Sequence, residues 1–291
     1  MNMRFGVSFW KLEDRASWME KSRRAEDLGY HVITVPDHID MPSPFPACVL
    51  AAEATRSVRV GTFVSNTSFY SPALFARDVV TTAQLTGGRL EVGLGAGWKK
   101  KEFDQAGIPF EAAGKRVDRL VETLDEVNRS WNAARPRFGA ASDRPPLMIG
   151  GNGDRVLRLA ARHADIVSFA GTGFDPQGRG MQFLTDRQMD DRVALVDAEL
   201  RASDRDTVHR NIIVLRTQVT DDRAAAREDY SRFLRGTLSP EQVGELPAVL
   251  IGSPEQIAEQ LITRRERFGF DYVTVQESAL DTFAKVIALL R

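Results

Sequence analysis

The chain has 291 residues, of which 43% are hydrophobic, and its 39 basic and 40 acidic residues leave a formal net charge of −1. This length suits a single barrel of about 250 residues better than a minimal domain. The balanced charge gives no reason to expect nucleic acid or an anionic membrane as a partner. The sequence has no run of about 18 consecutive apolar residues, which a membrane-spanning helix would need.

The single cysteine, Cys48, lies in the apolar stretch ACVLAAEA and excludes a disulfide within the chain. It is best interpreted as a small buried hydrophobe. The N-terminus MNMRFGVSFW leads into a strand pattern without a signal-peptide pattern, so we expect a cytoplasmic location. We predict one domain, residues 1–291, with two small domains as the alternative.

Apolar runs that resemble buried strands alternate with helical periodicity, which is typical of repeated βα units around a parallel sheet. The eight predicted strands are Arg4–Trp10, His31–Pro36, Val58–Ser65, Leu90–Leu94, Leu147–Gly150, Ile166–Ala170, Asn211–Val219 and Tyr272–Gln276. Such units can close into a barrel or remain an open doubly wound sheet. Length and the position of the motifs favour a closed (β/α)₈ TIM barrel.

Amphipathic helices are expected between these strands. The residues predicted to face the core are Trp18, Ala25 and Leu28, then Leu74, Val79, Val80 and Leu85, then Val117, Leu120, Leu124 and Val127. Gly29 and Gly87-Gly88 are typical helix stops. Two longer departures from the repeat, Gly171–Asp186 and Thr220–Pro254, predict rim insertions or extra helices.

Asp37 and His38 follow the second predicted strand directly, which places both side chains at the C-terminal rim, where barrel enzymes keep their active sites. His31, His163 and His209 are expected at the opposite end. An imidazole titrates near neutral pH and suits proton transfer, and Asp37 could orient it or hydrogen-bond a cofactor. The alternative is that the pair caps a helix or binds a neighbouring side chain.

Small residues follow the third and fourth predicted strands. The segment GTFVSNTS, with Thr62, Phe63 and Val64, is either an ordinary turn or a place where a flat ring approaches the backbone. The segment GLGAGW, with Gly95, Ala96 and Gly97, is followed by KKKEF and not by an apolar helix start, which disfavours a dinucleotide fingerprint and favours close packing against a ligand. Lys99–Lys101 form a solvated face or indicate a nearby anion.

The segment LMIGGNGDRVLRLAARHAD combines a strand, a glycine loop and a helix start. Backbone N–H groups of Gly151, Asn152 and Gly153, together with the positive end of the helix, would form a phosphate cradle. The alternative is a tight turn without a ligand.

These motifs resemble the bacterial luciferase-like monooxygenase superfamily, and within it the coenzyme F420-dependent (deazaflavin) oxidoreductases. The matching segments are RFGVSFW, WMEKSRRAEDLGYHVITVPDH, VRVGTFVSNT, GGRLEVGLGAGWKKKEF, GKRVDRLVETL, PPLMIGGNGDRVLRLAARHADIVSF and GSPEQIAEQLITRRERFGFDYVTV. They span nearly the whole chain in the expected order.

The resemblance implies a barrel that binds a flavin or deazaflavin at its C-terminal rim. Asp37 and His38 then match the acidic residue and histidine beside the reactive ring, and Phe63-Val64 matches a non-proline cis peptide against that ring. Gly150 and Gly151 match backbone donors to the cofactor phosphate. Trp98 stands where the dehydrogenases of this branch have a glutamate. The resemblance therefore does not imply that this chain has their sugar-phosphate substrate or their full acid/base pair.

The resulting prediction is hydride transfer between coenzyme F420 (8-hydroxy-5-deazaflavin) and a small organic substrate, with His38 handling the proton. Phe9, Trp10 and Trp98 are expected to shape the substrate pocket, and no metal is predicted. The alternatives are an FMN-dependent monooxygenase served by a separate reductase and a non-catalytic flavin-binding barrel. The pattern leaves a homodimer as an open option.

Overall fold

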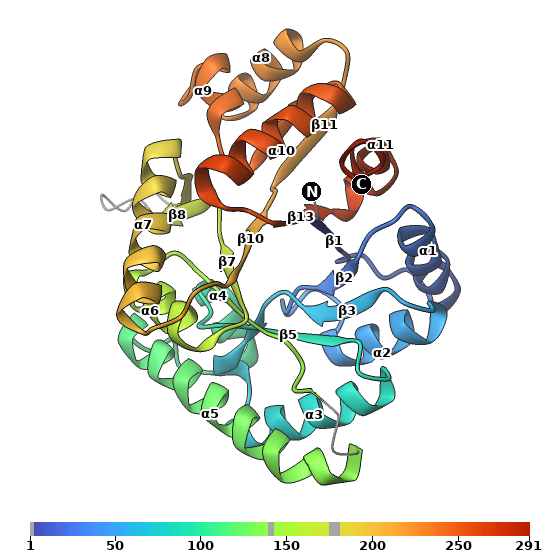
Figure 1. Cartoon of the computed structure of the whole chain (residues 1–291), viewed down its shortest axis with the longest axis vertical. Coiled ribbons are helices and arrows are strands. Elements are labelled where there is room, and N and C mark those ends of the chain that lie inside the picture. The colour runs from blue at the N-terminus through green and yellow to red at the C-terminus, as the bar shows by residue number, and fades with distance from the viewer. Residues whose placement is uncertain (1–2, 139–142, 175–180) are drawn as a thin grey trace.

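The computed structural model describes residues 3–138, 143–174 and 181–291. Eight parallel strands close into a barrel, because the outer strands of the sheet also pair with each other, β3 with β5. Figure 1 shows the strands surrounded by helices. The barrel strands are β1 (Arg4–Ser8), β2 (Val32–Val35), β3 (Arg59–Thr62), β5 (Leu90–Gly95), β6 (Leu147–Gly150), β7 (Ile166–Phe169), β10 (His209–Ile213) and β13 (Tyr272–Gln276). The predicted (β/α)₈ barrel is confirmed.

Helices connect successive strands on the outside of the barrel, which is the arrangement that right-handed βα crossovers produce. They are α1 (Arg15–Asp27), α2 (Pro44–Ala54), α3 (Pro72–Leu85), α5 (Ala113–Phe138), α6 (Asp154–His163), α7 (Asp186–Ala202) and α10 (Pro254–Phe268), and α11 (Leu280–Leu290) follows the last strand. The predicted stops are confirmed by the left-handed backbone at Gly29, Gly87 and Gly88. Every helix of the described residues is too short or too polar to span a bilayer.

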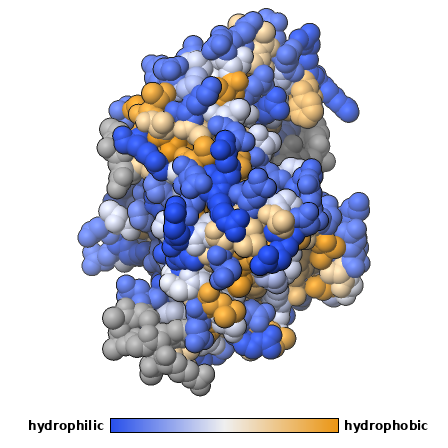
Figure 2. Space-filling view, turned by 90° about the vertical axis from the view of Figure 1, so that its right-hand side faces the viewer, coloured by the Kyte–Doolittle hydropathy of each residue, from blue (hydrophilic) through white to orange (hydrophobic). Residues whose placement is uncertain are grey.

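The main core lies between the strands and the helices. Alternate strand residues such as Phe5 and Val7 face outward and pack against helix residues such as Phe283. A smaller apolar cluster of Val32, Phe63, Met148, Ile166 and Tyr272 fills the barrel interior. On the side of the molecule shown in Figure 2, hydrophobic residues form separate patches within a hydrophilic surface.

The helix faces were predicted correctly in part. Trp18, Ala25, Val79, Val117, Leu120, Leu124 and Val127 are buried. Leu74 and Leu85, however, are 51% and 64% exposed. The buried face of α3 is instead formed by Phe75, Ala76, Val79, Thr82 and Ala83. Thr82 and Ala83 are not strongly apolar. The hydrophobic pattern therefore predicts a buried face that includes Leu74 and Leu85 and omits these two residues.

The predicted strand Asn211–Val219 is wrong as a single strand. Its first part belongs to β10, whereas Arg216–Val219 forms β11 and pairs with β12 (Val249–Gly252) in a separate two-stranded parallel sheet. Together with α8 (Arg223–Phe233) and α9 (Pro240–Glu245), this sheet buries a small apolar cluster of its own around Tyr230 and Val243. The insertion therefore has its own packing, while the single-domain organisation of the chain stays a prediction.

The other predicted insertion begins after β7 and lies partly outside the described residues. Its described parts form an antiparallel pair, β8 (Thr172–Phe174) with β9 (Met181–Phe183). Both insertions leave the barrel at the carboxyl ends of strands, as predicted, so both lie on the rim where barrel enzymes carry their active sites.

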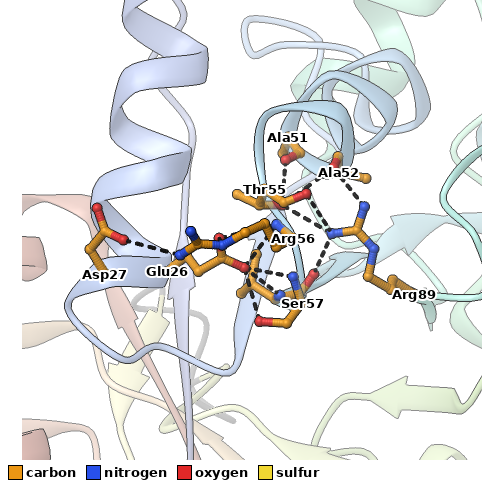
Figure 3. Close-up of polar contacts among 9 residues, drawn as sticks. Glu26, Asp27, Ala51, Ala52, Thr55, Arg56, Ser57 and Arg89 are labelled. Carbon is orange, nitrogen blue, oxygen red and sulfur yellow. Dashed lines mark hydrogen bonds and ion pairs between the residues drawn. The ribbon is translucent and has the colours of Figure 1, made fainter.

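The opposite end of the barrel carries a dense polar cluster, drawn in Figure 3. The Glu26 carboxylate accepts hydrogen bonds from the backbone N–H groups of Arg56, Ser57 and Val58, at 2.7–3.1 Å. Arg89 caps the end of α2, because its Nη2 donates to the Ala52 carbonyl at 2.6 Å. These contacts fix the α2–β3 connection against α1 and β5.

Candidate active site

His38 stands in the loop between β2 and α2, at the C-terminal rim. Its Nδ1 lies 2.8 Å from Oε1 and 3.0 Å from Oε2 of Glu102. Glu102 belongs to the short helix α4 (Lys100–Ala106), and its side chain is only 4% exposed. A buried carboxylate bound to one imidazole nitrogen fixes the ring orientation and stabilises the protonated ring.

Glu102 was not among the predicted site residues. Glu102 lies four residues after Trp98, the position at which the resemblance implies a glutamate in the dehydrogenases. The available signal is the spacing from Lys99 to Glu102, which suits an i,i+3 ion pair on one face of a helix. Nothing in the sequence indicates that the partner of this glutamate is His38, which lies 64 residues earlier.

Two of the three lysines in the run Lys99–Lys101 have acidic partners close by in the chain. Lys99 Nζ lies 2.9 Å from Glu102 Oε1, and this hydrogen bond raises the pKa of Lys99. Lys100 Nζ lies 2.7 Å from the Asp104 carboxylate. Oε1 of Glu102 therefore binds both Lys99 and His38, and the lysine balances the negative charge beside the imidazole.

Asp37 has a different partner from the one considered in the sequence analysis. Its Oδ2 accepts a hydrogen bond from the Asn66 backbone N–H at 2.9 Å, and its carboxyl interacts with the Tyr70 hydroxyl. Burial raises the pKa of Asp37, and the Asn66 N–H opposes that rise. Asp37 thus holds the loop after β3, whereas Glu102 orients His38.

The Phe63–Val64 peptide bond is cis, as predicted. Val64 follows Phe63 into the barrel mouth, and the glycines of neighbouring strands leave room for it. A Cβ atom at Gly95 would lie 2.5 Å from Val64 Cγ2, and one at Gly150 would lie 3.1 Å from Val64 Cγ1. The packing partner of these two glycines is Val64, where the sequence analysis had expected a ligand.

Two further predicted cofactor residues have structural partners. The buried Thr62 hydroxyl donates to the Gly93 carbonyl at 2.8 Å and accepts from the Gly93 N–H at 2.9 Å. Gly97 has φ +73°, and a Cβ there would lie 2.4 Å from Asn66 Oδ1. The Thr62 side chain is therefore committed to β5, and a cofactor could use only its backbone. Ala96, which lies between Gly95 and Gly97 in the chain, is half-buried against the core.

The loop between β6 and α6 supplies fewer free donors than predicted. The Gly151 N–H donates to the Ser168 carbonyl at 3.1 Å, so it is not available to a phosphate. The Asn152 side chain binds the Thr172 carbonyl at 2.7 Å and accepts from the Ala170 N–H at 3.2 Å, which ties this loop to the β7–β8 connection.

Donors remain at the start of α6. Within the described parts of the chain, the backbone N–H groups of Asn152 and Gly153 have no acceptor. Gly153 is the N-cap, and a Cβ built there would meet nothing within 4 Å. Asp154 in the first turn is paired with Arg192. Unpaired N–H groups at an open helix N-terminus fit a phosphate group.

The three predicted pocket aromatics divide into two kinds. Phe9 is fully buried and packs edge-on against Trp18, with ring centroids 5.8 Å apart, so its assignment to the substrate pocket is wrong. It shares the outward-facing side of the first strand with Phe5 and Val7. Trp10 and Trp98 are exposed at the rim.

Two sizeable cavities lie away from His38. One, of about 610 Å³, is lined by Trp10, Lys21 and Glu277, among others. Glu277 follows β13, and its carboxylate accepts from the Trp10 N–H at 3.3 Å. The other, of about 950 Å³, opens at the N-terminal end of the barrel between Arg59 and Asp271. Among the described residues, no cluster of histidine, cysteine and acidic side chains has the arrangement of a metal site.

Comparison with known proteins shows what this chain is similar to. Residues 12–248 match the model of the luciferase-like monooxygenase family. The chain belongs to this family. It is 28% identical to an F420-dependent glucose-6-phosphate dehydrogenase of Kribbella flavida, over 94% of this chain and 93% of the relative. It is 29% identical to the 5,10-methylenetetrahydromethanopterin reductase of Archaeoglobus fulgidus, over 56% of this chain but only 52% of the reductase.

Solved structures share the fold at low sequence identity. An F420-dependent secondary alcohol dehydrogenase in complex with an F420–acetone adduct superimposes with a TM-score of 0.77 at 16% identity, and the whole of both chains is covered. The oxygenating constituent of 3,6-diketocamphane monooxygenase from Pseudomonas putida, in complex with FMN, gives a TM-score of 0.75 at 15% identity, over 99% and 97% of the chains. Proteins that use either cofactor therefore have this barrel.

Proposed function

We propose that the protein is a deazaflavin-dependent oxidoreductase that transfers a hydride to or from a small organic substrate at the C-terminal rim of the barrel. The observation that carries this proposal is the contact of His38 Nδ1 with the buried Glu102 carboxylate. The relatives named for coenzyme F420, one of which matches nearly the full length of the chain, support the choice of cofactor.

His38 is the residue that moves the proton. With Nδ1–H donated to Glu102, Nε2 is the free acceptor of the ring, and among the described residues it has no hydrogen-bond partner. Nε2 can take a proton from a substrate hydroxyl, or return one to a carbonyl oxygen, while Glu102 stabilises the charged ring. Lys99 Nζ lies 2.9 Å from Glu102 Oε1 and places a second positive group beside this carboxylate.

The cofactor phosphate would be held at the start of α6. The backbone N–H groups of Asn152 and Gly153 are the donors, and the helix dipole adds favourable potential. When bound, a deazaflavin supplies the hydride chemistry, which no protein side chain can supply. Asp37, Phe63 and Val64 would border its ring, because they occupy the ends of β2 and β3 beside His38.

A binding experiment separates this proposal from its alternatives. The purified protein is titrated with deazaflavin and, separately, with FMN, and each is followed by ligand fluorescence. We expect deazaflavin to bind at least tenfold more tightly than FMN. Tight binding of FMN alone would instead support a monooxygenase fed by a separate reductase. Binding of either cofactor without turnover of any substrate would support a non-catalytic barrel.

A further inference from the structure

Buried arginine nitrogens without a partner are concentrated in the second rim insertion and in the helix that follows it. In the part of the chain that the structure describes, Nε of Arg223 and Arg227 in α8 is buried and has no hydrogen-bond partner. The same holds for Nη1 of Arg264 and Arg265 in α10. Buried polar groups normally have partners, so these donors are available to a ligand.

Arg264 is the most deeply buried of these arginines, with 7% of its surface exposed. Its Nη2 donates to the carbonyls of Leu246 and Val249, at 2.8 Å each. Burial lowers the pKa of Arg264 to about 10, and the positive charges of Arg223 and Arg227 contribute to this lowering. One nitrogen of the guanidinium therefore holds the connection between α9 and β12, while Nη1 remains unused.

Contacts bring Arg223 and Arg227 to the same part of the insertion. They lie four residues apart in α8 and so share one face of that helix. A Cβ atom at Gly244 in α9 would lie 2.3 Å from Cζ of Arg227, and one at Gly252 in β12 would lie 3.4 Å from Cδ of Arg223. The helices α8, α9 and α10 all contact β12, and Figure 1 shows them together at the top of the molecule. Arg223, Arg227 and Arg264 therefore form one arginine cluster around β12.

The two half-buried members of the arginine cluster have no acidic partner. Among the described residues, neither Arg223 nor Arg227 forms a hydrogen bond or an ion pair. Burial and the charge of Arg223 lower the pKa of Arg227, although Glu241 and Glu245 act in the opposite direction. Glu241 accepts a hydrogen bond from the Ser239 hydroxyl at 2.8 Å and not from an arginine of the cluster.

The remaining charges near the cluster leave it positive. The Asp186 carboxylate favours the charged form of Arg264, but it also forms an ion pair with Arg267. Arg223 is the first residue of α8, and the N-terminus of a helix carries a partial positive charge. The cluster thus combines an excess of positive charge with unused N–H donors, and a bound anion would compensate both.

We propose that the arginine cluster is a binding site for a phosphate group, either as the free ion or as part of a small molecule. Guanidinium groups present their N–H donors in a planar fork that matches phosphate oxygens. A small anion fits better than an acidic protein surface, because Arg264 is almost completely buried. The site uses none of the donors proposed for the cofactor phosphate at the start of α6, so the inference does not rest on the proposed function.

The test compares melting temperatures in sodium phosphate and in sodium chloride at equal pH and ionic strength, so that general screening by salt is the same. We expect 10 mM phosphate to raise the melting temperature by about 2 °C, because a ligand that binds only the folded state stabilises it. Equal melting temperatures in the two salts, and with glucose 6-phosphate, overturn the inference.

Glucose 6-phosphate distinguishes the two sources of the phosphate group. Stabilisation by both ligands shows that the phosphate group alone is recognised. Stabilisation by glucose 6-phosphate alone shows that the site takes an organic phosphate. Either result supports the inference only if the shift depends on the arginine cluster.

Matched variants provide that requirement. Arg223→Gln and Arg227→Gln should each remove most of the shift, whereas Arg232→Gln, at an exposed arginine of the same helix, should keep it. Arg264 is left in place because it also binds the carbonyls of Leu246 and Val249. A shift that persists in both cluster variants, or that disappears equally in Arg232→Gln, overturns the inference.

A purely structural role of the cluster gives a different result in chloride alone. There, Arg223→Gln and Arg227→Gln should melt no lower than the wild type, because each removes a positive charge without a partner. A clear loss of stability in chloride would show that these arginines stabilise the fold without an anion, and it overturns the inference.

The donors at the start of α6 are the other place where phosphate could bind. The melts are therefore repeated with Gly153→Pro, which lacks one of those donors, and the shift should be unchanged. Loss of the shift in Gly153→Pro would place the anion at α6 and overturn the inference. Deazaflavin affinity is measured separately on the wild type and on Arg227→Gln, where it should be equal, and absence of deazaflavin binding rejects only the proposed function.

Discussion

The two ends of the barrel use polar groups in opposite ways. At the N-terminal end, the Glu26 carboxylate accepts hydrogen bonds from three successive backbone N–H groups and from the Ser57 hydroxyl (Figure 3). The Arg89 guanidinium donates to three backbone carbonyls, those of Ala52, Thr55 and Val58. At the C-terminal rim, only one of the two ring nitrogens of His38, Nδ1, has a hydrogen-bond partner among the described residues. Polar groups whose hydrogen-bonding capacity is fully used stabilise the fold. Polar groups with an unused donor or acceptor are available to a ligand.

The same contrast appears in the acidic side chains. Burial alone would raise the pKa of Glu26, but the hydrogen bonds from Ser57, Val58 and Arg56 outweigh it and lower the pKa to about 2. Asp37 at the rim accepts fewer such bonds, and burial raises its pKa. A carboxylate that stabilises the fold is thus kept ionised, while the one beside the site takes up a proton more readily.

The largest expected effect is at the rim and concerns turnover only. His38→Ala should lower turnover about 100-fold or more, because general acid–base catalysis contributes that much, while deazaflavin affinity and melting temperature stay within error. Steady-state kinetics and a thermal melt measure both. His163→Ala, at an exposed histidine in α6, is the control. An equal loss of affinity would make His38 a binding residue, and full activity would remove it from the mechanism.

At the opposite end, the expected effect is on stability only. Glu26→Gln should lower the free energy of unfolding by about 1–3 kcal/mol, because backbone donors lose a charged acceptor. Urea denaturation measures this change. Glu20→Gln removes an exposed carboxylate from the same helix and should leave stability within about 0.5 kcal/mol. If Glu26→Gln lowered turnover without lowering stability, the division between the two ends would be wrong.

A smaller effect is expected at the phosphate cradle. Gly153 has φ −68°, which proline can adopt, so Gly153→Pro removes one N–H donor at a compatible backbone angle. Gly153→Ala keeps the donor. The proline variant should weaken deazaflavin binding about tenfold, and the alanine variant should bind normally, with a melt to check folding. Equal binding by both variants would contradict a phosphate at this N–H group.

The pH dependence of Glu26 gives the smallest effect. Its folded pKa of about 2 lies below the unfolded value of 4.5, so its contribution to stability is complete above pH 4.5 and is lost as the pH falls toward 2. The stability difference between the wild type and Glu26→Gln should therefore shrink between pH 5 and about pH 3, as measured by urea denaturation. A constant difference over this range would show that the charge of Glu26 contributes nothing.

Local patterns were sufficient for the eight βα units and for the position of His38, while length and the position of the motifs favoured closure into a barrel. The alternation of buried strands and amphipathic helices is a short-range property of the chain, and strand direction places Asp37 and His38 at the C-terminal rim. Even Phe9 could have been assigned correctly, because Phe5, Val7 and Phe9 alternate along one strand and must share a face.

Other features depend on contacts between distant segments. The apolar stretch Asn211–Val219 reads as one strand, and only pairing with β12 divides it. The Gly151 N–H is occupied because β7 brings the Ser168 carbonyl to it. Both the division of this strand and the hydrogen bond of Gly151 depend on which backbone groups of distant segments come into contact. The hydrophobic periodicity of the sequence gives no information about these contacts.

The sequence by itself determined that this chain forms eight βα units, and that an imidazole and a carboxylate stand where one of its strands ends. Only the tertiary structure decided that Glu102, and not the adjacent Asp37, orients His38. The reason is geometric, since barrel closure brings the segment after β5 to the end of β2, and side chains that are neighbours in the chain point in different directions.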